Sequence, residues 1–181
     1  METLLPTEIL EAEHRFIDKV VDVIGKRLDT QPVEVSFVVQ EVEQIIDFMR
    51  IYADKCHHGK EEDLLFPALT ERGVPTQGCP VGALRGDHKR GRSYVGELAD
   101  GVGMLKNGDQ SGFEKIEKGL EGIVSLYPNH IWKEDFLLFP MTIKVMSSDD
   151  LADLGEKFEQ VDNEMGKEKI KSYESFAMGF S

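Results

Sequence analysis

The chain has 181 residues, 40% apolar and 30% charged, which suits one globular domain with a real hydrophobic core. Its 34 acidic and 21 basic residues give a net charge of −13, which argues against nucleic acid or an anionic membrane as a general partner. We see no apolar run near the roughly 20 residues of a spanning helix and no signal-peptide pattern at the N-terminus. Two cysteines are too few for a disulfide framework. We therefore expect a cytoplasmic protein.

Apolar residues recur at steps of three and four along most of the chain, which predicts helices. Four long helices are expected, over residues 7–28, 33–71, 83–106 and 113–146. Pro128 should kink the fourth helix or open one of its turns. "SSDD" at 147–150 is a helix start signal, so a fifth, polar helix is expected over 149–165. The predicted fold is all-α: an up-down-up-down four-helix bundle over 1–146 and a helical extension over 147–181 that packs on or beside it.

One eleven-residue phrase occurs twice, as HHGKEEDLLFP at 57–67 and HIWKEDFLLFP at 130–140. Each copy has a His and a Glu four residues apart, which places both on one face of a helix. The helix before each copy carries a single His on its apolar stripe, 43 and 42 residues upstream. Two such helical hairpins related by a pseudo-two-fold axis would bring six side chains together: His14, His57, Glu61, His88, His130 and Glu134.

Four imidazoles and two carboxylates inside an apolar core point to a metal centre, because an unpaired buried carboxylate is costly. Six ligands without a thiolate are too many for one tetrahedral zinc. They divide into two metals with two His each, and this donor set suits iron or manganese better than zinc. We therefore predict two iron ions, bridged by Glu61, Glu134 and an oxo or hydroxo group, with room for a small exogenous ligand.

Three neighbouring residues could support the metal ligands by hydrogen bonds without binding the metal themselves. Tyr127 lies on the stripe of His130 and packs in the core, donates to a bridging carboxylate or is an extra ligand at the open position. His58 should point about 100° away from His57 on an α-helix, to the surface or to a second-shell position. Glu62 lies either on a solvated face or accepts a hydrogen bond from a ligand. An apolar wall beneath the metals is expected from Leu64, Leu65, Phe66, Leu137, Leu138 and Phe139.

The order H, H-x-x-x-E, H, H-x-x-x-E, over roughly residues 5–145, resembles the hemerythrin-like family, also called the HHE cation-binding domain. The resemblance implies a four-helix bundle with a non-haem di-iron centre at the six positions above. The oxygen-carrying branch of the family has a second His one turn after the third-helix ligand, where this chain has Arg92. That branch also ends on an Asp five residues after its His, whereas Glu134 follows at four. One fewer imidazole implies a more open iron, which favours redox chemistry, nitric oxide binding or iron exchange over oxygen transport.

Three functions remain open at this point. The first is a protein that binds, senses or reduces a small oxidant such as dioxygen, nitric oxide or peroxide, with a separate redox or signalling partner; an oxidoreductase or peroxidase-type activity would belong here. The second is storage or donation of iron for repair of iron–sulfur or di-iron centres. The third is a structural module that a metal stabilises. Either a monomer or a homodimer suits all three.

Overall fold

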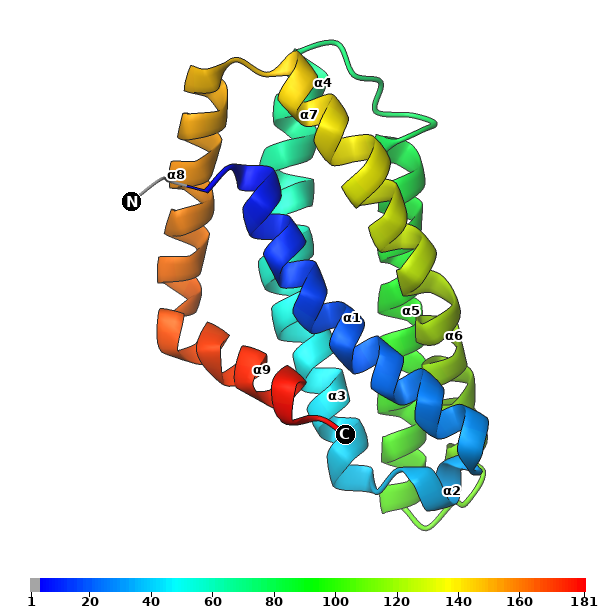
Figure 1. The fold of residues 1–181 in the computed structure, drawn as a ribbon. Coiled ribbons are helices and arrows are strands. Elements are labelled where there is room, and N and C mark those ends of the chain that lie inside the picture. The colour runs from blue at the N-terminus through cyan, green and yellow to red at the C-terminus, as the bar shows by residue number, and fades with distance from the viewer. Residues whose placement is uncertain (1–3) are drawn as a thin grey trace.

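The computed structural model describes residues 4–181, which form helices and short connections without a strand. Four long helical segments run alternately up and down, and two further helices lie against them (Figure 1). The predicted all-α four-helix bundle with an additional C-terminal helix is confirmed. The elements are α1 (Pro6–Thr30), α2 (Val33–Ser36), α3 (Val39–Phe48), η1 (Met49–His58), η2 (Glu61–Leu65), α4 (Phe66–Glu71), α5 (Val81–Lys106), α6 (Gly112–Lys133), η3 (Glu134–Leu138), α7 (Phe139–Val145), α8 (Ser148–Met165) and α9 (Lys167–Gly179).

The helix expected over 33–71 begins later than predicted. One turn, α2, is followed by extended backbone at Phe37 and Val38, and the long helix starts at α3. Several β-branched residues lie at this point and weaken helix formation. The break buries the Phe37 ring, which lies 4.2 Å below the guanidinium of Arg27. Glu41 then caps α3 by accepting a hydrogen bond from the Val38 N–H at 3.2 Å.

The helices that carry the two repeated phrases widen into π-helix, marked η. Segments η2 and η3 cover the same part of each copy, EEDLL and EDFLL, and η1 precedes η2. Pro128 lies inside α6 without opening one of its turns, and the widened turn begins at Glu134 instead. π-Helical turns are rare and often accompany functional sites, because they change the direction in which side chains point.

α5 and α6 form a closely packed hairpin because glycines face the partner helix. A Cβ added at Gly119 would lie 2.5 Å from a methyl carbon of Leu98 and 2.8 Å from the carbonyl oxygen of Tyr94. One at Gly101 would lie 2.6 Å from the carbonyl oxygen of Gly112. The two backbones therefore approach more closely than side chains would allow, which fixes the relative position of the helices carrying His88 and His130.

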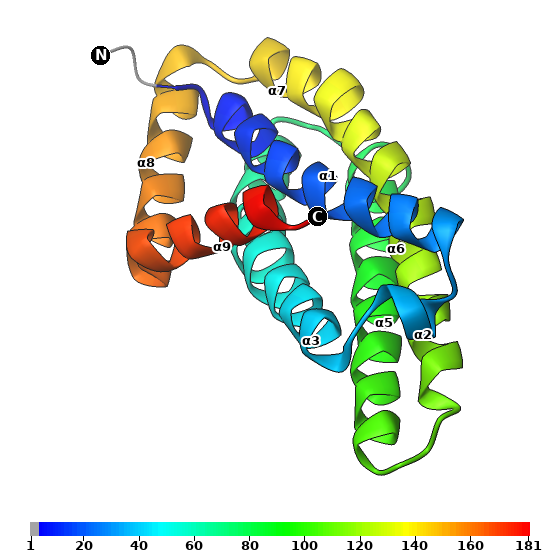
Figure 2. The ribbon, with the colours of Figure 1, turned by 60° about the horizontal axis from the view of Figure 1, so that its bottom comes forward.

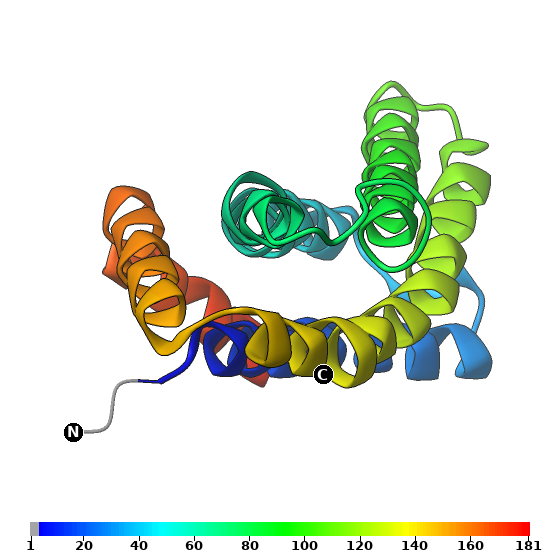
Figure 3. The same cartoon turned by 90° about the horizontal axis from the view of Figure 1, so that it is seen from above.

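The C-terminal helices extend the core beyond the bundle. α8 stands beside the N-terminal part of α1, and α9 runs from the C-terminal end of α8 back toward α1 (Figures 2 and 3). Leu151, Leu154 and Phe158 of α8 are buried in one apolar cluster with Leu10 and Leu65. Among residues 4–181, no helix is long and apolar enough to cross a membrane.

Candidate metal centre

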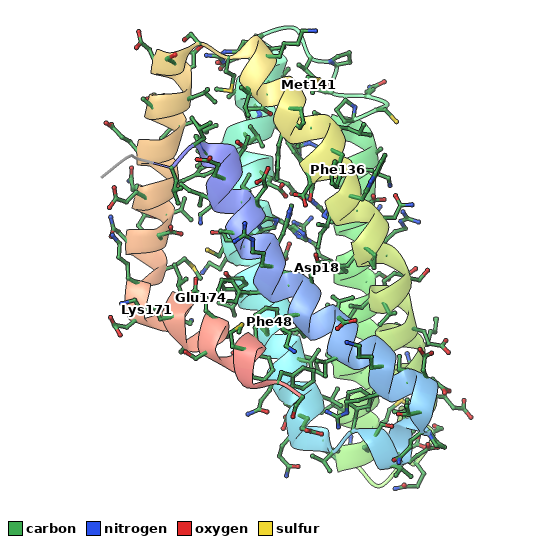
Figure 4. The ribbon with its side chains drawn as sticks, viewed as in Figure 1. Asp18, Phe48, Phe136, Met141, Lys171 and Glu174 are labelled. Carbon is green, nitrogen blue, oxygen red and sulfur yellow. The ribbon has the colours of Figure 1, made fainter. Side chains whose placement is uncertain are left out.

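All six predicted ligands meet in the middle of the bundle, where Figure 4 shows nitrogen and oxygen atoms gathered between α1 and its neighbours. Each is at most 2% exposed. Glu134 Oε2 lies 3.2 Å from His14 Nε2 and 3.3 Å from His130 Nε2. Glu61 Oε2 lies 3.8 Å from His57 Nε2 and 3.4 Å from His88 Nε2. Each carboxylate thus lies between imidazoles of both halves of the repeat, as a bridging ligand must.

Within residues 4–181, the atoms that face the centre have no hydrogen-bond partner. Both oxygens of Glu61, both oxygens of Glu134 and the Nε2 atom of each imidazole are buried and unpaired. Buried polar atoms in proteins are nearly always hydrogen-bonded, so a cluster of unpaired ones calls for an explanation. Carboxylate oxygens and imidazole nitrogens are metal donors, and their atoms fall into groups within 4.8 Å of one another. The residues therefore fit one or more cations.

The outer nitrogen of each ligand imidazole faces a carboxylate in the same arrangement in both halves. Asp135 lies 2.7 Å from His14 Nδ1, and Glu62 lies 2.6 Å from His88 Nδ1. Glu13 lies 2.9 Å from His57 Nδ1, and the equivalent Asp87 lies 3.7 Å from His130 Nδ1. A carboxylate can only accept, so the Nδ1–H groups of His14, His57 and His88 donate to theirs, whereas the 3.7 Å from His130 Nδ1 to Asp87 is too long for a hydrogen bond. The Nε2 atom of each ring points to the centre.

Charged partners shift the pKa values of these groups strongly. Burial would raise the pKa of Glu62, but the hydrogen bonds from His88 and Arg92 outweigh it and lower that pKa to about 2. Burial would lower the pKa of His14, yet its contacts with Asp135 and Glu134 raise that pKa to about 10. Burial and the nearby Glu134 raise the pKa of Glu61. These shifts show how strongly the central carboxylates and imidazoles interact, and a bound cation would compete with protons for the same atoms.

For each of the three additional candidates, the structure rules out one of the positions that the sequence left open. His58 is 2% exposed, so a surface position for it is wrong; η1 is a π-helix, and its adjacent rings His57 and His58 both turn inward, 5.6 Å apart. Glu62 is 19% exposed and acts as the acceptor for His88 rather than lying on a solvated face. Tyr127 packs its ring 5.9 Å from that of His130 and makes no hydrogen bond to either central carboxylate among the described residues.

The apolar wall follows the repeat. Phe66 stacks on His88 at 5.9 Å, and the equivalent Phe139 stacks on His14 at 5.6 Å. Leu65 and Leu138 are fully buried below them. Leu137, however, is 50% exposed, because the widened turn η3 directs it outward, so its expected place in the wall is wrong.

A buried ion-pair network links the centre to α8 and was not predicted. Lys60 is 0% exposed, pairs with Glu13 and lies 2.6 Å from Asp162 Oδ1. Glu13, Cys56 and Asp162 could hold a cation by their atom types, but the Lys60 ammonium already supplies the positive charge there. The repeat alignment offers the signal that was missed: Glu13 and Asp87 precede the single His of each half, and Lys60 and Lys133 are equivalent.

Two hollows lie against the centre from outside. One of about 120 Å³ is lined by His58, Tyr127, Gly91 and Arg92, among others. The second, of about 290 Å³, is lined by His14, Asp135 and Phe136, among others. The first is well below the roughly 300–1,000 Å³ of pockets that hold drug-sized ligands, and the second is at the lower end of that range.

Comparison with known proteins agrees with this geometry. The family model described as "Hemerythrin HHE cation binding domain" matches residues 5–142. Uncharacterised proteins of Mycobacterium tuberculosis and Mycobacterium bovis are 26% identical over 155 residues, which cover 84% of this chain. The match spans 59% of the length of those relatives. No solved structure matched the chain.

Proposed function

Because this chain belongs to the hemerythrin HHE cation-binding family, we propose that it is a non-haem di-iron protein that binds, senses or reduces a small oxidant. The observation that carries the proposal is the set of buried, unpaired Nε2 and carboxylate oxygen atoms. Four imidazoles and two carboxylates are too many ligands for one tetrahedral ion, and this combination of ligands suits iron. His14, His57, His88 and His130 would be terminal ligands, with Glu61 and Glu134 between the two ions.

Bound iron would supply an Fe(II)/Fe(III) couple and a position for dioxygen, nitric oxide or peroxide. The chain itself contributes three things. Carboxylates orient His14, His57 and His88 through Nδ1, Phe66 and Phe139 keep bulk water from two of the imidazoles, and surface hollows lie beside His14 and His58. Turnover would require electrons from a separate reductant.

The burial of the donors also bears on the alternative functions. An iron donor must release its metal readily, whereas ligands that are at most 2% exposed favour slow release. A purely structural metal would need no open position and no route for a small molecule. The two hollows therefore favour the small-oxidant function over both alternatives.

The test is metal analysis after anaerobic purification with Fe(II), followed by optical titration with air, nitric oxide and peroxide. We expect two irons per chain and an absorption band that forms on oxidation and bleaches on reduction. Glu61→Gln should lose iron, while Glu71→Gln, a control on a side chain of the same helix that is 79% exposed, should not. Zinc, or loosely held iron without a spectral response, would contradict the proposal and support the structural or donor functions.

A further inference from the structure

His58 has the same environment as the four predicted imidazole ligands. Its Nδ1 lies 3.2 Å from Asp54 Oδ1, and its Nε2 is buried without a partner. Its ring lies nearly parallel to that of His88 at 3.8 Å and 5.6 Å from that of His130. An imidazole lone pair lies in the ring plane, so binding one ion together with His88 requires His58 to turn out of this stack. The ligand atoms of His58, His88 and His130 lie within 4.8 Å of one another. Two imidazole nitrogens that bind one metal in cis positions, each at roughly 2.0–2.1 Å from it, lie closer to each other than 4.8 Å.

Arg92 of α5 lies one turn after His88, where the oxygen-carrying branch of the family has a second His. Its Nη2 lies 2.8 Å from Asp54 Oδ1 and 3.0 Å from Glu62 Oε1. These are the carboxylates that accept from His58 and His88. Arg92 thus holds both acceptors in place from outside, and the additional imidazole comes from η1 instead of from α5.

We propose that His58 is a fifth imidazole ligand, grouped with His88 and His130 on one metal, while His14 and His57 hold the other. This inference rests on the proposed di-iron centre and adds a ligand that the motif does not contain. It makes the two ions unequal, with three imidazoles on one and two on the other. The ion held by His14 and His57 then has fewer protein ligands, and His14 is the member of this pair that lines a surface hollow.

The repeat supports this asymmetry independently. Asp54 and His58 of the first half align with Tyr127 and Ile131 of the second half. Ile131 is 5% exposed and belongs to the apolar core, so the second half buries an apolar residue at this place. One half can therefore supply a fifth imidazole and the other cannot.

The test compares wild type, His58→Ala and Tyr127→Phe, each loaded with ⁵⁷Fe(II) without oxygen. Tyr127 lines the same hollow as His58 and serves as the matched control. Mössbauer spectra should show two iron sites of equal area in wild type and in Tyr127→Phe. In His58→Ala one of the two iron sites should change its Mössbauer spectrum, because that iron has lost a ligand, and the same iron should pass to a chelator more than about tenfold faster. Added imidazole, which can occupy the space left by the ring, should slow that release again.

His58→Gln provides a second variant in case the alanine protein does not fold, because its amide keeps the volume and can still meet Asp54. We expect the same accelerated release from it. Two irons held as in wild type, with an unchanged Mössbauer spectrum in the folded variant, would overturn the assignment. The proposed function fails separately, if wild type itself binds no iron pair or shows no response to oxidants.

Discussion

Replacing Lys60 with Met removes the ammonium that pairs with two carboxylates between the metal centre and α8. Asp162 is 26% exposed and can turn toward water once Lys60 is gone. Glu13 is 10% exposed and would keep its position with no compensating cation close by. Removing one partner of a buried ion pair costs about 3–5 kcal/mol, and Met fills much the same volume. We expect a loss of that size in the free energy of unfolding of the metal-free protein.

Lys133→Met is the matched control, because Lys133 occupies the same position in the second copy of the phrase. Its side chain is 30% exposed and lies 2.9 Å from Asp87, which also pairs with Arg90. Asp87 therefore keeps a cation when Lys133 is replaced. The expected loss is about 1 kcal/mol or less, as for other partly exposed ion pairs.

Urea unfolding of the metal-free variants, followed by circular dichroism of the helices, measures both losses. Adding Glu13→Gln to Lys60→Met should restore part of the stability, since a buried amide costs less than a buried unpaired carboxylate. Equal losses for Lys60→Met and Lys133→Met would refute the reasoning, because the two positions differ mainly in burial and in the second cation.

Two further predictions concern packing and reactivity. Cys56 is buried, and burial raises the pKa of its thiol to about 12, whereas Cys79 is exposed. A thiol reagent near neutral pH should therefore modify Cys79 in the folded protein and Cys56 only after unfolding. Equal rates of modification at the two cysteines in the folded protein would contradict this. Gly119→Ala should lower the free energy of unfolding by about 1–3 kcal/mol, because its Cβ would meet the Tyr94 carbonyl oxygen. Gly103→Ala, where a Cβ meets nothing within 4 Å, should raise it by about 0.5–1 kcal/mol, and urea unfolding of both variants checks the difference.

The sequence predicted the helices and the convergence of the six central residues because both follow from local periodicity. His14 and His88 share stripes with apolar neighbours, and each His-x-x-x-Glu pair shares a helix face. It could not predict that His58 turns inward, because an α-helical geometry was assumed where η1 is a π-helix. Helical periodicity does not show where a helix widens.

Contacts between distant elements were also beyond sequence reasoning. Lys60 reads as an ordinary charged residue until α8 brings Asp162 to it, 102 positions later in the chain. Phe37 ends the short helix α2 because its ring finds a buried place below Arg27, which no local pattern reveals. Burial decided both outcomes, and burial depends on the whole fold.

The duplicated sequence explains which parts of the centre are equal and which are not. Carboxylates at equivalent positions face equivalent imidazoles in both halves: Glu62 and Asp135 face His88 and His14, each across the two halves. A pseudo-two-fold axis repeats any interaction whose residues are repeated, so these outer contacts alone would give two alike metal sites. A difference between the sites has to come from residues that the repeat does not share. Ile131 stands where the first half has His58, so the ring that stacks on His88 has no counterpart in the second half, and any difference between the halves that reaches the centre includes this position.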